Sequence, residues 1–263
     1  MTGMIDALAA EWLKLRTVRS THWVLAATAA LLAVVLLLAV QFVRQWDELP
    51  AERQAEVGLL PLQQMGGWVA ALCLAVLGVL SVTAEYRTGT IRTTFTALPR
   101  RRTVLAAKAA VVGTVALVAG EVMAVGSFLG MRLVAGDRPM PDQQAPVAHD
   151  LPGYVVFGTS GAMFALLGLG LGALLRSTAG ALVAIVMLWY VVPMAAVFIP
   201  EPWGERVGSV MPGALPVQAG GLDANDATMF VNVLPAGAAA VLMAVYAFGP
   251  LGLAAFLLTR RDA

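Results

Sequence analysis

Long apolar runs alternate with short polar segments along the chain. Four such runs contain no charged residue, a fifth contains only Glu121, and the sixth begins its span at Pro235. Because a helix needs about 20 apolar residues to cross the ~30 Å hydrocarbon core of a bilayer, each run is long enough to span a membrane. We therefore predict six transmembrane helices, over residues 23–43, 65–84, 109–131, 153–175, 178–199 and 235–258.

The composition agrees with this pattern. Of the 263 residues, 59% are hydrophobic and only 13% are charged, whereas a soluble domain is about one quarter charged. In lipid the backbone must satisfy its own hydrogen bonds, so each run is expected to be helical. Asp6 and Glu11 precede the first run, which argues against a cleaved signal peptide. We expect an all-α integral membrane protein with a single polytopic domain over residues 1–263.

The basic residues predict the orientation. Six spans place both termini on one side, together with the segment 85–108. That side carries twelve lysines and arginines and the opposite side carries five. Since lysine and arginine accumulate on the cytoplasmic side of a membrane, we expect a multi-pass protein of the cytoplasmic (inner) membrane with both termini in the cytoplasm. The twelve bases are Lys14, Arg16, Arg19, Arg87, Arg92, Arg100, Arg101, Arg102, Lys108, Arg176, Arg260 and Arg261.

The segment 85–108 between the second and third spans is unusually polar. An apolar stripe at helical spacing runs through it, formed by Ile91, Phe95 and Leu98. Pro99 ends this helix, which is too short to cross a membrane. Two interpretations are open. The helix is either an anchor on anionic lipid or a rigid projection that docks on a protein partner.

The segment also contains the pattern E-x-x-x-G-T-I-R, followed by L-P-R-R-R-x-x-x-x-x-K. This pattern resembles the cytoplasmic loop between helices 2 and 3 of ABC-2 type transporter permeases. Those proteins are six-helix membrane subunits of ATP-driven exporters, and the loop forms their coupling helix, which docks on the nucleotide-binding subunit. The stretch 1–21 resembles the amphipathic elbow helix of the family. Its apolar stripe is Ile5, Leu8, Trp12 and Leu15, beside Glu11, Lys14, Arg16 and Arg19.

The resemblance assigns roles by position within the loop. Glu85 is expected at the cytoplasmic end of the second helix, where it either pairs with Lys108 or is solvated. Arg101 or Arg102 matches the basic position after the proline. The residues that match the coupling element are Gly89, Thr90, Ile91, Arg92, Phe95 and Leu98.

No phosphate-binding loop of the form G-x-x-x-x-G-K-[ST] occurs, so the chain is not expected to be an enzyme. The resemblance instead implies a separate ABC ATPase subunit that carries ATP and Mg. It also implies a second permease protomer, identical or different, in the lipid bilayer. No cofactor fingerprint, metal-ligand cluster or nucleic-acid patch is found in the sequence. Exported substrates of such a family include drugs, antibiotics, peptides, lipids and ions.

Two residues within the predicted spans indicate other functions. Glu121 lies deep in the third span, where acids are costly and often functional. It either lines a translocation path, as in a secondary ion-coupled carrier, or hydrogen-bonds a neighbouring helix. Ser160 lies in a G-x-S-G motif that resembles rhomboid intramembrane proteases, but neither His22 nor His149 lies in the sixth span to serve as its base. The glycines around Ser160 otherwise indicate close helix packing.

Overall fold

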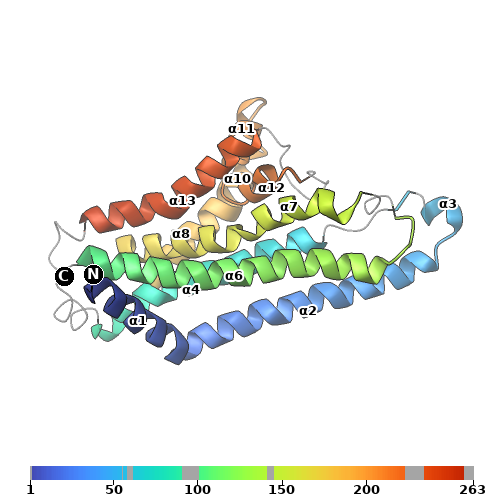
Figure 1. The fold of residues 1–263 in the computed structure, drawn as a ribbon. Helices are drawn as coiled ribbons and strands as arrows, with labels where there is room; N and C mark the ends of the chain where they lie inside the picture. The colour runs from blue at the N-terminus through green and yellow to red at the C-terminus, as the bar shows by residue number, and fades with distance from the viewer. Residues whose placement is uncertain are drawn as a thin grey trace.

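A computed structural model describes residues 2–54, 56–57, 62–90, 101–140, 145–222 and 234–257, and these form helices without strands (Figure 1). The helices are α1 (Thr2–Thr17), α2 (Arg19–Asp47), α3 (Ala51–Gln54), α4 (Leu62–Thr88), α6 (Arg101–Ala135), α7 (Val147–Gly158), α8 (Ser160–Leu175), α9 (Thr178–Val186), the π-helix η2 (Met187–Val191), α10 (Val192–Ala196), α11 (Trp203–Ser209), α12 (Leu215–Gly220) and α13 (Ala236–Leu257).

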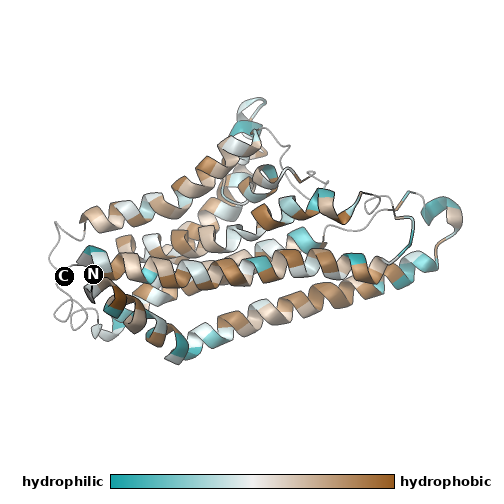
Figure 2. Cartoon of the chain, viewed as in Figure 1, coloured by the Kyte–Doolittle hydropathy of each residue, from teal (hydrophilic) through white to brown (hydrophobic). Residues whose placement is uncertain are grey.

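Six helical stretches of the described chain are long and apolar enough to cross a membrane, which confirms the predicted number. They are α2, α4, α6, the continuous pair α7–α8, the stretch α9–η2–α10, and α13. The helix α2 has 29 residues and is therefore about 43 Å long, which exceeds the ~30 Å hydrocarbon core. Apolar residues dominate the middle of the long helices, and hydrophilic residues gather at their ends (Figure 2). These properties are those of a multi-pass membrane protein.

The helix α8 is the centre of the bundle and packs against α4, α6 and α13. Glycines allow its backbone to approach its neighbours closely. A Cβ atom at Gly78 of α4 would lie 1.9 Å from the carbonyl oxygen of Ala165, and one at Gly168 would lie 2.3 Å from that of Ala75. Small residues at such positions are how membrane helices associate, because lipid offers no hydrophobic driving force between them.

The described residues 203–222, between α10 and α13, fold back onto the bundle. Their short helix α12 packs against both α7 and α13. The Gln218 side chain holds this arrangement: its Nε2 donates to the carbonyl oxygen of Ser209 at 2.8 Å, and its Oε1 accepts from the backbone N–H of Leu234 at 2.9 Å. Because both ends of the buried amide are satisfied, this segment forms a defined cap.

The first helix, α1, is separate from the first span. Val18 is extended, with φ −82° and ψ 122°, and breaks the helix before α2 begins. Figure 1 shows α1 running obliquely at the end of the bundle where α4 and α13 finish and α6 starts. We call this the α1 end. Ala7, Glu11 and Leu15 are buried, while Ile5 and Trp12 remain exposed.

Candidate functional site

Four charged side chains from three helices meet at the α1 end of the bundle. Glu11 and Lys14 come from α1, Glu85 from the last turn of α4, and Lys108 from the beginning of α6. The two lysines are the only ones in the sequence. We call these four residues the charge cluster.

Within the charge cluster each lysine contacts both carboxylates. Lys108 Nζ donates to Glu85 Oε1 at 2.9 Å and also to Glu11 Oε2. Lys14 Nζ donates to Glu11 Oε1 at 2.6 Å and to Glu85 Oε1 at 2.9 Å. Two cations and two anions therefore form a closed, electrically neutral set that joins α1, α4 and α6.

The charge cluster is largely removed from water. The side chains of Lys108 and Glu11 are each 5% exposed and that of Glu85 is 10% exposed, whereas Lys14 is 38% exposed. Charges this deep are tolerated only when they are paired. For Lys14, burial lowers the pKa, but the hydrogen bonds to Glu11 and Glu85 outweigh it and raise the pKa above 10.5. Lys14 is therefore protonated at neutral pH.

The placement of these charges shows that they serve contacts between helices. Glu85 lies in the last turn of α4, where the negative end of the helix dipole disfavours an acid. Glu11 lies between Ala7 and Leu15 on the face of α1 that is buried, and α1 packs mainly against α6. An acid in each of these positions is stabilised only by the lysines opposite.

A cavity of about 410 Å³ lies beside the charge cluster. Its polar lining includes Ser81, Thr88 and Thr90, and its apolar lining includes Leu77. Glu85 Oε2 is buried and has no hydrogen-bond partner among the described residues. The second carboxylate oxygen of Glu85 is thus the one atom of the charge cluster without a partner in the part of the chain that the structure describes.

The structure tests the sequence expectations for the 85–108 segment only at its two ends. Glu85 pairs with Lys108, so that alternative is confirmed over a solvated Glu85. Gly89 has φ +73° directly after α4, the left-handed conformation in which glycine commonly ends a helix. Thr90 Oγ1 lies 2.9 Å from Thr88 Oγ1. The remaining coupling positions, Ile91, Arg92, Phe95 and Leu98, lie outside the described residues.

Glu11 and Lys14 belong to the charge cluster, whereas the sequence placed them only beside the apolar stripe of α1. Two signals in the sequence pointed to them. The chain has only two lysines against 15 arginines, and lysine and arginine do not replace each other freely in tight ion pairs. Glu11 also lies four residues from both Ala7 and Leu15, on what becomes the face that packs against α6.

Glu121 and Ser160, the residues for which the sequence left other functions open, lie apart from the charge cluster. Glu121 on α6 is half-buried, and a Cβ atom at Gly158 would lie 2.6 Å from its Oε2. The carboxylate therefore lies against the glycine that ends α7. No hydrogen bond or ion pair joins it to another described residue, so the bond to a neighbouring helix, one of the two alternatives from the sequence, is not found there.

Ser160 is buried at the start of α8. The ring Nδ1 of His22 lies 3.1 Å from the carbonyl oxygen of Val18, and that of His149 lies 3.0 Å from Asp150 Oδ1. Both histidines therefore have local partners at the helix ends. Gly161 instead allows α8 to approach α6, since a Cβ atom there would lie 2.7 Å from the carbonyl oxygen of Ala116. These contacts favour a packing role for the motif over a protease.

Compared with models of known protein families and with curated proteins, the chain gives no match. Its functional interpretation rests on the pattern of the 85–108 segment and on the geometry of the charge cluster at the ends of that segment.

Proposed function

We propose that this chain is the membrane permease subunit of an ABC-2 type exporter, driven by ATP hydrolysis on a separate ATPase subunit. The observation that carries the proposal is the charge cluster. It joins α1 to the end of α4 and to the beginning of α6, the two helices that flank the loop. This is where a coupling loop needs a rigid base, because force applied to a loop reaches the membrane only through the helices that hold it.

In this proposal the ATPase binds residues 89–98 and moves them when it closes on ATP. The pair of Lys108 with Glu85 keeps the two helix ends together, so the loop moves α4 and α6 as one unit. These helices have 27 and 35 residues, and each is a continuous span. The displacement therefore reaches the opposite end of the bundle.

The exposed face of α1 supports its role as the elbow helix. Met4, Ile5, Trp12 and Leu13 are all at least 40% exposed, although they are apolar. A helix with such a face and a charged opposite face lies in the membrane interface. Glu11 and Lys14 then connect this interfacial helix to the coupling loop. The ATPase carries ATP and Mg, and substrate crosses between this chain and a second permease protomer.

Affinity purification tests the proposal. The tagged chain is extracted in mild detergent from its native cells, and its partners are identified by mass spectrometry. We expect a protein with a G-x-x-x-x-G-K-[ST] loop in the wild-type sample and its loss with Phe95→Ala, while the variant still inserts into the membrane. Phe198→Ala, an exposed phenylalanine just beyond α10, is the control and is expected to retain the partner. An ATPase absent from every sample contradicts the proposal.

A further inference from the structure

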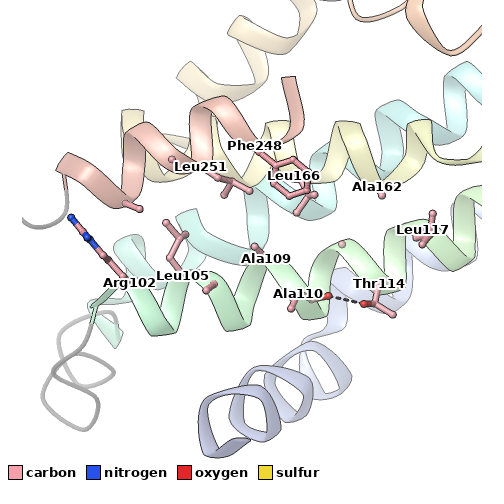
Figure 3. A pocket seen from close by; sticks show the side chains of 14 residues that line it. Arg102, Leu105, Ala109, Ala110, Thr114, Leu117, Ala162, Leu166, Phe248 and Leu251 are labelled. Atoms are coloured by element: carbon pink, nitrogen blue, oxygen red, sulfur yellow. Dashed lines mark hydrogen bonds between the residues drawn. The ribbon is translucent and has the colours of Figure 1, made fainter. Parts of the chain in front are cut away.

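An apolar groove of about 650 Å³ lies between α6 and α13, with α8 as its floor (Figure 3). One wall is formed by α6 from Leu105 to Leu117, and the other by α13 from Phe248 to Ala255. The groove opens on the side of a bundle of membrane-spanning helices. Any molecule that occupies the groove is therefore a component of the membrane.

Small residues create the space. Ala109, Ala110 and Gly113 line the α6 wall, and Gly252 lines the α13 wall. A Cβ atom at Gly252 would meet nothing within 4 Å. This differs from Gly78 or Gly168, where a Cβ atom would collide with the backbone of a neighbouring helix. Gly252 therefore faces the open groove, whereas Gly78 and Gly168 lie at close contacts between helices.

The groove has a charge at one end only. Thr114 donates its hydroxyl to the carbonyl oxygen of Ala110 at 2.8 Å, so it offers no free donor. Arg102 is the one charged residue of the lining, and its guanidinium extends from the start of α6 toward the end of α13 (Figure 3). It forms no hydrogen bond or ion pair with another described residue. The groove is therefore apolar along its length and cationic at the α1 end.

The dimensions fit a hydrocarbon chain. From Leu105 to Leu117 the helix α6 rises about 18 Å, close to the ~15 Å depth of one leaflet of the hydrocarbon core. Dividing the volume of about 650 Å³ by this length gives a mean cross-section of about 36 Å². A hydrocarbon chain about 4 Å thick therefore fits along the groove.

We propose that this groove binds an anionic phospholipid of the inner leaflet, with one acyl chain along α6 and the headgroup phosphate on Arg102. The distribution of basic residues predicts that the α1 end faces the cytoplasm, where anionic lipids gather. A guanidinium binds the phosphate of a phospholipid with two parallel hydrogen bonds, and its positive charge favours a headgroup whose net charge is negative. The site does not depend on the exporter function.

Native mass spectrometry of the purified, delipidated chain tests this site. Phosphatidylglycerol and phosphatidylcholine with identical acyl chains are added in turn, and the dissociation constant of the first bound lipid is measured. We expect phosphatidylglycerol to bind more tightly. Arg102→Ala should weaken phosphatidylglycerol about five-fold, the loss of one basic residue at a membrane surface, and weaken phosphatidylcholine less, because the choline cation offsets the attraction between its phosphate and Arg102. Arg87→Ala, an exposed arginine at the same end, is the control and should bind like the wild type.

A second pair of variants tests the groove itself. Gly252→Leu fills it and should weaken both lipids, whereas Gly237→Leu, in equally open space on the same helix, should weaken neither. Ala110→Leu fills the groove from the other wall and replaces Gly252→Leu if that variant fails to fold. Inorganic phosphate should not compete, because the acyl chain supplies most of the affinity.

Equal binding of the two lipids overturns the proposal. Unchanged lipid affinity in Arg102→Ala and in the filled variants also overturns it. If filling the groove then also converts a dimer to a monomer, the groove is an interface with a second copy.

Discussion

Replacing Lys108 with methionine removes the most buried cation of the charge cluster. Its Nζ contacts both carboxylates, and at an effective dielectric constant of about 20 the contact with Glu85 at 2.9 Å corresponds to about 6 kcal/mol. Loss of the lysine also removes the cost of its own burial, so the net effect is smaller. Breaking a buried ion pair from one side typically costs about 3–5 kcal/mol. We expect the free energy of unfolding of Lys108→Met to fall by about 4 kcal/mol.

Thermal unfolding in detergent, followed by tryptophan fluorescence, measures this loss. For a chain of this size about 1 kcal/mol corresponds to a shift of 2–4 °C, so the midpoint should fall by about 8–16 °C. Lys14→Met is the matched control. Because the Lys14 side chain is 38% exposed, its pairs are partly screened by water and the loss should be about 1 kcal/mol.

A double variant distinguishes an ion pair from simple loss of packing. Combining Glu85→Leu with Lys108→Met removes one anion and one cation and leaves the pair of Glu11 with Lys14 intact. The double variant should therefore be more stable than Lys108→Met alone, since removing a buried pair together is often close to neutral. If the losses of the two single variants simply add, or if Lys108→Met unfolds like the wild type, the charge cluster does not hold these helices together.

Three further predictions concern other residues. Gly168→Val places side-chain atoms against the backbone of Ala75, where even a Cβ atom would lie 2.3 Å away, and should cost more than about 3 kcal/mol in thermal unfolding, while Gly237→Val in open space should change little. Glu121→Gln removes a carboxylate that has no partner among the described residues, so it should raise the free energy of unfolding by no more than about 2.5 kcal/mol; a lower free energy of unfolding would reveal a partner. Since the pKa of Lys14 is raised above its ordinary value of 10.5 by Glu11 and Glu85, its stabilising contribution is complete below pH 10.5 and disappears as the pH rises through the folded-state pKa. The wild type should therefore lose this contribution to the free energy of unfolding at alkaline pH, whereas Lys14→Met, which lacks the contribution, should not.

The number of spans followed from the sequence because it depends only on the length of apolar runs. The pairing of Glu85 with Lys108 was one of two alternatives that the sequence left open, since the helix ends on either side of a loop are neighbours but a helix end can also be solvated. The rotation of α1 about its own axis was not predictable. Its stripe of Ile5, Leu8, Trp12 and Leu15 fits lipid or protein equally well, and packing against α6 decides that Leu15 and Glu11 face inward.

The groove illustrates a second limit of sequence analysis. Gly168 belongs to the run of glycines after Ser160 that indicates close helix packing, but no pattern in the sequence says whether Gly252 meets a neighbouring helix or open space. Gly168 lies where two backbones meet, and Gly252 faces open space. The distinction depends on the distance between helices, which many side chains of the core determine together.

Photo-cross-linking at position 95 tests the central claim most directly. A photoreactive benzoylphenylalanine replaces Phe95 in the otherwise native chain, with the same residue at Leu133 as the control, since that side chain is exposed toward the other end of α6. The account predicts that irradiation of native membranes joins position 95 to a protein with a G-x-x-x-x-G-K-[ST] loop, and that position 133 gives no such product. Cross-links from position 95 to lipid alone would contradict it and assign the segment to membrane anchoring.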